Sequence, residues 1–203
     1  WAGGVAALAG VDVSMAPARG VMVSVEYDDQ IPVLNRCRDP DDGDIVVPHE
    51  TEAVLGTTSV PVSDPDEYEQ AAWEVERSIE ECAAMLPALA GREPRRTYWG
   101  VRPLYEPDEA ARDSAGDGLN SETGTDESRG ISRDFALLEH AADGVDNAVT
   151  IVGGKLTTHR LMAEATADRV CATLGVDAAC RTAEEQLPGA DDAATLDRYV
   201  REF

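Results

Sequence analysis

Lysine is almost absent from this chain of 203 residues: Lys155 is the one lysine, and the other 16 basic residues are arginines. Acidic residues number 40, which gives a formal net charge of -23. A surface this negative repels nucleic acid and anionic lipid, which argues against both as partners. It is typical of a protein adapted to high salt, where screening removes the repulsion between carboxylates. A plain solvated acidic coat is the alternative.

The cysteines are few and scattered, and no two of them form a CxxC pair; they are Cys37, Cys82, Cys171 and Cys180. This spacing argues against a zinc site and against a disulfide-dense secreted fold, so we expect reduced thiols and no metal site. No apolar run approaches the ~20 residues of a membrane-spanning helix. The sequence also contains no P-loop and no pattern of a Ser-His-Asp triad.

The patterns in the first half predict an α+β fold, an antiparallel sheet with packed helices. Residues 20–34 alternate apolar and polar around Asp28-Asp29, which predicts a hairpin, and two further strands are expected at 44–48 and 53–62. Residues 1–10 are expected to be the tail of a helix. A helix after Pro65 is expected to lay one face on the sheet, because its apolar residues recur at helical spacing; they are Ala72, Val75, Ile79, Cys82, Ala83 and Leu86.

The second half predicts a strand at 97–105 and, from Glu106 to Gly130, a mobile surface loop poor in large apolar residues. A strand at 148–154 and a helix ending at Gly175 follow, and then an acidic extension. The chain starts at Trp1 in a helical pattern and also stops in one, so we expect a fragment of a longer protein.

The stretch "GGKLTTHR" from Gly153 to Arg160 is a candidate binding turn. A strand leads into Gly153-Gly154 and a helix begins near Thr157 or Thr158, so glycines allow a close backbone approach and free N–H groups favour electron-rich ligands. Lys155 projects a compact cation beside them. The alternative is an ordinary strand-to-helix turn with an exposed lysine. A solvent-facing lysine could have been replaced by arginine, as at the other basic positions of the chain, so the presence of Lys155 favours a binding role.

Two arginines are candidates for binding an anion. Arg102 in "WGVRPL" lies between apolar residues, and an arginine in such a setting usually has a fixed anionic partner. That partner is either an internal carboxylate or a substrate phosphate, which a guanidinium binds with two hydrogen bonds. Arg133 in "SRDF" follows the same logic more weakly, because Asp134 is a local partner. The patch Gly56–Ser59 is a weak sign of a close ligand approach.

Four stretches resemble, in order and spacing, the FAD-dependent glycerol-3-phosphate dehydrogenases, and most closely their anaerobic-type large (A) subunit. They are "PVLNRCRDPDDGDIVVPHETEAVLGTTSVPV", "YWGVRPLYEP", "SRDFALLEHA" and "TIVGGKLTTHRLMAEATADRVC". The resemblance implies a two-domain flavoprotein whose antiparallel sheet roofs the flavin. It places residues 1–14 in the tail of an FAD-domain segment, 15–98 in the substrate (cap) domain, 99–175 in the return to the FAD domain and 176–203 in a C-terminal extension.

The resemblance also implies roles for the candidate residues. Arg102 and Arg133 would clamp the phosphate of sn-glycerol 3-phosphate, and Lys155 would lie near the flavin or the substrate oxygen. The cofactor residues would be Gly153, Gly154, Lys155, Leu156, Thr157 and Thr158. A hydride would pass from substrate C2 to FAD, and electrons would go on to a quinone through partner subunits of a hetero-oligomer. The protein would be cytoplasmic or peripheral to the inner face of the cell membrane.

Some features of the resembling family are missing from this sequence. The GxGxxG fingerprint and the cysteine-rich tail are absent, so we expect this fragment alone to bind FAD poorly and to be inactive. The general base is not identifiable. Two alternatives stay open at this point: another FAD-dependent enzyme of the amine or amino-acid oxidase type, and a non-catalytic fragment that docks subunits.

Overall fold

The computed structural model describes residues 1–106 and 135–186, together with residues 192, 194, 197 and 198. The chain forms two compact units, Trp1–Arg133 and Asp134–Phe203. The predicted loop at 106–130 lies outside the described residues except for Glu106. Most of the predicted extension beyond residue 186 lies outside them as well.

The first unit contains a six-stranded antiparallel sheet. Its strands are β1 (Ala18–Glu26), β2 (Leu34–Asn35), β3 (Ile45–His49), β4 (Glu52–Gly56), β5 (Val60–Pro61) and β6 (Pro94–Arg102). The order is β2-β3-β4-β1-β5, and β6 also pairs with β1. The long strand β1 is therefore the centre of the sheet.

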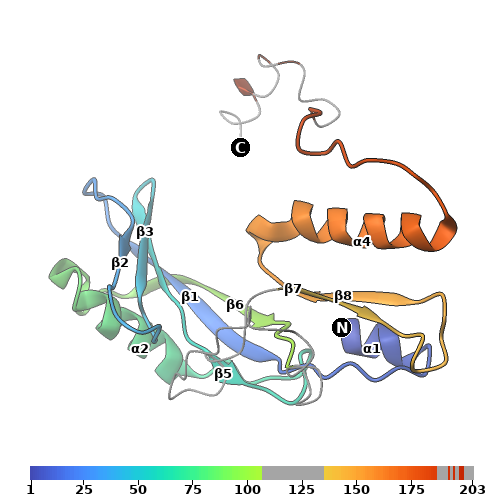
Figure 1. The fold of residues 1–203 in the computed structure, drawn as a ribbon. Helices are drawn as coiled ribbons and strands as arrows, with labels where there is room; N and C mark the ends of the chain where they lie inside the picture. The colour runs from blue at the N-terminus through green and yellow to red at the C-terminus, as the bar shows by residue number, and fades with distance from the viewer. Residues whose placement is uncertain (107–134, 187–191, 193, 195–196, 199–203) are drawn as a thin grey trace. The chain divides into compact units, whose positions relative to one another are not determined.

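Helix α2 (Ala72–Ala83) covers one face of this sheet (Figure 1). Val21, Val23 and Val25 alternate along β1 and form the core with Ile79 and Cys82 of the helix. The predicted amphipathic helix is confirmed, and it ends before the short 3-10 helix η1 (Pro87–Leu89). The expected N-terminal helix is also present as α1 (Ala2–Ala7).

The predicted hairpin around Asp28-Asp29 is wrong. β1 pairs with β4, β5 and β6, whereas Leu34–Asn35 pairs with β3. Alternation of apolar residues identifies a strand that buries one face, but it does not identify the partner of that strand. The strand expected at 53–62 is interrupted too, because Thr57–Ser59 separate β4 from β5.

Strand β6 extends across residues 98 and 99, where the resemblance places the boundary between the substrate domain and the FAD domain. It pairs with β1 from Pro94 to Arg102, and Tyr105 then bridges to Met15. The sheet thus continues past residue 98. The assignment of segments to a substrate domain and an FAD domain stays a prediction.

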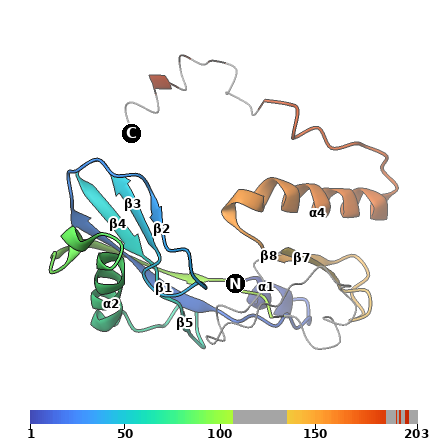
Figure 2. The ribbon, with the colours of Figure 1, turned by 60° about the vertical axis from the view of Figure 1, so that its left-hand side comes forward.

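The second unit is a hairpin with a helix. Strands β7 (Phe135–Glu139) and β8 (Val149–Gly153) are antiparallel, and η2 (Leu156–Thr158) leads into α4 (His159–Leu174). Figure 2 shows α4 along the β7–β8 hairpin. The predicted helix and its end at Gly175, which has a φ of 68°, are confirmed. Its apolar residues Leu161, Val170 and Leu174 remain exposed.

No helix in the described part of the chain is long and apolar enough to cross a bilayer. The same residues hold no group of three or more His, Cys, Asp or Glu side chains suited to a metal ion.

Candidate active site

Arg102 lies at the end of β6, on the sheet face opposite α2. Its partner in the ladder is Ala18, and its Nη2 donates a hydrogen bond to the hydroxyl of Thr57 across 2.9 Å. The side chain is half-buried. The guanidinium is therefore held against the sheet, with its Nη1 atom buried.

A pair of glycines makes room beside Arg102. Gly20 on β1 faces Gly100 on β6. A Cβ at Gly20 would lie 2.8 Å from Nη1 and 2.9 Å from Nη2 of Arg102, and 2.4 Å from the carbonyl oxygen of Thr58. A Cβ at Gly100 would meet nothing within 4 Å. The guanidinium thus occupies the space that a side chain at Gly20 would take, and the neighbouring surface over Gly100 is open.

The sheet face with Arg102 differs sharply from the face beneath α2. Because neighbouring residues of a strand point to opposite faces, Arg19 points away from Gly20 and toward the helix, where it pairs with Glu74 across 2.8 Å. On the face with Arg102, Tyr98 is exposed at 48% and pairs with Met22. A ligand would therefore find accessible polar and aromatic groups on this second face.

The predicted binding turn has the local geometry that the sequence indicates. Gly153 and Gly154 have φ angles of 75° and 72°, a region that residues with a Cβ rarely adopt. A Cβ at Gly154 would also lie 2.6 Å from the sulfur of Met162 and 3.0 Å from the Thr158 hydroxyl. The two glycines are thus required for the sharp reversal between β8 and the helix.

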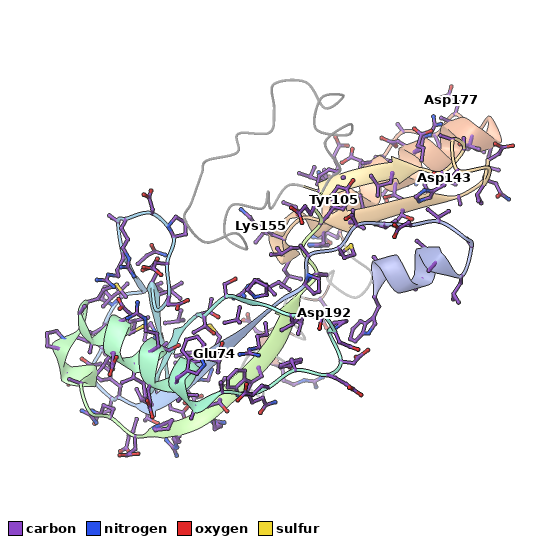
Figure 3. All side chains as sticks on the ribbon, turned by 90° about the horizontal axis from the view of Figure 1, so that it is seen from below. Glu74, Tyr105, Asp143, Lys155, Asp177 and Asp192 are labelled. Carbon is purple, nitrogen blue, oxygen red and sulfur yellow. The ribbon has the colours of Figure 1, made fainter. Side chains whose placement is uncertain are left out.

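Thr158 fixes the other end of this turn. Its hydroxyl accepts a hydrogen bond from the N–H of Lys155 and donates one to the carbonyl of the same residue, both across 2.9 Å. Lys155, Leu156 and Thr157 are exposed, and Leu156 is 88% accessible. Figure 3 shows Lys155 at the start of the segment that leads into α4. The turn presents a cation and a large apolar side chain to solvent.

The candidate residues are distributed over both units. Arg102 belongs to the first unit and the Gly153–Thr158 turn to the second. Arg133 lies outside the described residues. The convergence of Arg102, Arg133 and Lys155 on one pocket therefore stays a prediction.

Two arginines in the turn before β3 have internal carboxylate partners. Arg36 pairs with Glu81 across 2.5 Å, and Arg38 pairs with Asp44 across 2.8 Å. The first contact joins the turn before β3 to α2, and the second lies within the turn, so this charged turn has a structural role.

A second buried carboxylate, Glu52, lies on β4 at the end far from Thr57. Ser24 and Arg96 donate hydrogen bonds to it, and Arg95 lies within ion-pair distance at 3.2 Å. The Ser24 hydroxyl, followed by Arg96, holds the pKa of Glu52 below its ordinary value. This cluster offers a comparison for Glu74, because both carboxylates are buried and both are paired with arginine.

Cys82 is buried between α2 and the sheet, with its sulfur 3.2 Å from the carbonyl oxygen of Gly43. Burial raises the pKa of this thiol to about 11. A thiol that stays protonated is a poor nucleophile and a poor metal ligand, so Cys82 is part of the core.

A groove of about 570 Å³ lies beside α2, and its lining includes Val75, Ile79, Arg92 and Thr97. None of the candidate residues lines this groove.

Comparison with known proteins gives the family. Residues 1–169 match the family described as "FAD dependent oxidoreductase" (DAO), and the chain belongs to this family. The resemblance found in the sequence is thereby confirmed at the level of the family. The mixed fold with antiparallel sheets agrees with it.

The curated relatives have names that are more specific than the family description. The chain is 46% identical over its whole length to the A1 subunit of the anaerobic glycerol-3-phosphate dehydrogenase of Haloferax volcanii, of which it covers 33%. It is 39% identical over 95% of its length to the corresponding subunit from Haemophilus influenzae, covering 32% of that protein. The chain thus spans about one third of these relatives. The first of them comes from a halophilic archaeon, in agreement with the acidic composition.

Two solved structures share the fold. The glycerol-3-phosphate dehydrogenase from Bacillus halodurans complexed with FAD matches 93% of this chain and 33% of its own, at a TM-score of 0.54 and 22% identity. The iminodiacetate oxidase from Chelativorans matches 89% of this chain and 42% of its own, at a TM-score of 0.55 and 16% identity. At these identities the likeness concerns the fold.

Sequence reasoning missed several residues around Arg102. Gly20 and Gly100 are 80 positions apart and become neighbours only through the pairing of β1 with β6. Thr57 lies in the patch that the sequence marks only weakly, and Glu74 looks like one more acidic residue on the exposed side of an amphipathic helix. No signal in a single sequence distinguishes Glu74 from the other 39 acidic residues.

Proposed function

We propose that the complete polypeptide containing this chain oxidises sn-glycerol 3-phosphate to dihydroxyacetone phosphate. The observation that carries the proposal is the 46% identity, over the whole of this chain, to one subunit of an anaerobic glycerol-3-phosphate dehydrogenase. The position of Arg102 supports it, because this half-buried residue lies beside the open sheet face over Gly100, and a guanidinium there suits a phosphate dianion.

The proposed cofactor is FAD, which when bound would supply the two-electron oxidant for the C2–H bond of the substrate. The residues that fit it are the turn Gly153–Thr158. Gly153 and Gly154 both have left-handed backbone conformations and let the backbone of the turn approach a bound group closely, and the start of the helix that follows favours an electron-rich ring edge or phosphate. Leu156 and Thr157 are exposed and thus available for contact.

The substrate would be bound by cations of this chain. Arg102, together with Arg133, would hold the phosphate and so fix the orientation of C2. Lys155 would stabilise negative charge that develops on the substrate oxygen or the ring as the C2 hydroxyl loses its proton. The group that accepts this proton is not among the candidates identified in this chain.

We also propose an assembly, an electron acceptor and a location for this protein. The relatives are named as single subunits of their enzymes, so this chain would belong to a hetero-oligomer that passes electrons through partner subunits to a quinone. Such a protein would be cytoplasmic, at the inner face of the cell membrane.

The proposal is tested with the complete polypeptide loaded with FAD and mixed without oxygen with a panel of substrates. Bleaching of the flavin absorbance by sn-glycerol 3-phosphate, but not by glycerol or amino acids, is expected. Bleaching by amino acids or amines alone would support an oxidase of that type. Absence of flavin binding would instead favour a subunit-docking role.

A further inference from the structure

Glu74 is a buried charge that none of the proposed roles uses. It lies on α2 (Figure 3). It faces the sheet and is 0% exposed. One carboxylate oxygen accepts a hydrogen bond from Nε of Arg19 across 2.8 Å, and the other accepts one from the Thr58 hydroxyl across 2.6 Å. Burying a carboxylate is costly unless each oxygen has such a partner.

Thr58 is held from two sides through the same hydroxyl group. The hydroxyl donates to Glu74 and accepts a hydrogen bond from the N–H of Val21 across 3.1 Å. Thr58 is itself 0% exposed. The short connection between β4 and β5 is thus fixed to α2 and to the central strand β1 at one residue.

Thr57, the residue next to Thr58, contacts Arg102, which is proposed to bind the substrate phosphate. The Thr57 hydroxyl accepts the hydrogen bond from Nη2 of Arg102. The carbonyl of Thr58 is close by as well, because the Cβ position at Gly20 lies near both that oxygen and the guanidinium. Glu74 and Arg102 therefore lie on opposite sides of the sheet and are connected through the dipeptide Thr57-Thr58.

We propose that Glu74 and Thr58 are positioning residues that hold Arg102 ready for the substrate phosphate. The inference rests on the proposed function of Arg102. A long side chain loses rotamer freedom when it binds a ligand, so a scaffold that fixes it beforehand strengthens binding. Glu74 acts beneath the sheet through Thr58, and Thr58 places the Thr57 hydroxyl that accepts from Arg102.

The test is a double-mutant cycle in the complete, FAD-loaded polypeptide at constant ionic strength. Glu74→Gln keeps the shape of the side chain but replaces one accepting oxygen by a donor, so it disturbs the bond from Thr58 or the bond from Arg19. Glu74→Gln is introduced into the wild-type polypeptide and, separately, into the Arg102→Ala variant. KM for sn-glycerol 3-phosphate and the inhibition constant of inorganic phosphate are measured, as is the rise in Tm that inorganic phosphate produces.

If Glu74 acts through Arg102, Glu74→Gln raises KM and the inhibition constant about fivefold or more when Arg102 is present, and less than about twofold when it is absent. The Tm rise shrinks in parallel, while kcat changes less than KM. Equal effects in both backgrounds, or no effect in either, would overturn the inference.

Two comparisons exclude a merely structural effect. Glu52→Gln changes another buried, arginine-paired carboxylate of the same unit, and it should leave phosphate binding unchanged. Thr58→Val removes the hydroxyl at nearly constant volume and should weaken phosphate binding as Glu74→Gln does, whereas Thr58→Ser should restore it. Failure of serine to restore binding would contradict the role of the hydroxyl, and this pair remains informative if Glu74→Gln does not fold.

The same experiment separates the inference from the function on which it rests. If Arg102→Ala alone leaves KM and phosphate inhibition within about threefold of wild type, Arg102 does not bind the phosphate and both proposals fail. If Arg102→Ala weakens both strongly and Glu74→Gln does not, only the positioning role fails.

Discussion

Gly20 and Gly100 face each other across β1 and β6, yet a methyl group fits at only one of them. At Gly20 it would lie 2.4 Å from the backbone oxygen of Thr58, and at Gly100 it would meet nothing within 4 Å. We predict that Gly20→Ala lowers the free energy of unfolding by about 1–3 kcal/mol, the usual cost of overpacking against backbone. Urea unfolding of the complete polypeptide measures this difference.

Gly100→Ala is the matched control for that substitution. It adds the same methyl group to the same face of the same strand pair and should change the free energy of unfolding by less than about 0.5 kcal/mol. A Gly20→Ala variant as stable as Gly100→Ala would mean that Arg102 and Thr58 do not lie where the structure places them.

Cys82 should resist thiol reagents in the folded protein. Its pKa of about 11 leaves almost no thiolate at pH 8, and its side chain is fully buried. Cys37 and Cys180 are exposed and should be modified first. Alkylation at pH 8 followed by peptide mass spectrometry gives the rate at each cysteine, and a Cys82 modified as fast as Cys37 without denaturant would refute its place in the core.

Glu52 should contribute to stability in a pH-dependent way. Its pKa in the fold lies below the ordinary value because of Ser24 and then Arg96, so its contribution is present above the ordinary pKa and is lost as the pH falls through the lowered one. Glu52→Gln should therefore destabilise the protein most near pH 7. The gap to wild type should narrow as the pH falls from about 5 to about 3. Urea unfolding at several pH values measures the gap, and a constant gap would contradict the assignment.

Salt should stabilise the protein strongly. The formal net charge of -23 favours unfolding through self-repulsion, and molar salt shortens the screening length to about 3 Å. We predict that Tm rises steadily between about 0.1 M and 3 M KCl, as followed by circular dichroism. A Tm that falls over this range would favour an ordinary solvated coat over adaptation to high salt.

The sequence predicted those parts of the fold that depend on local spacing. The apolar positions of α2 recur with the period of a helix, and Gly175 ends α4 as a left-handed residue. The partners of β1 could not be predicted, because its pairing with β6 joins residues that are 69 to 84 positions apart. The turn at Asp28-Asp29 looked like a hairpin only because both flanking segments alternate.

The candidate site was predictable to a similar extent. Arg102 and the glycine turn stand out through unusual residue types in apolar surroundings, which a sequence displays directly. Glu74 and Thr58 are 16 positions apart, and each is ordinary by itself. Their relation arises from the packing of α2 beneath the connection between β4 and β5, which no local pattern reports.

The phosphate-binding role of Arg102 is the central claim, and the steady-state kinetics of Arg102→Ala in the complete, FAD-loaded polypeptide test it most directly. Losing hydrogen bonds from a guanidinium to a charged phosphate should lower kcat/KM for sn-glycerol 3-phosphate about a hundredfold or more, mainly through KM, with Arg102→Lys in between. A kcat/KM within about threefold of wild type would contradict the account.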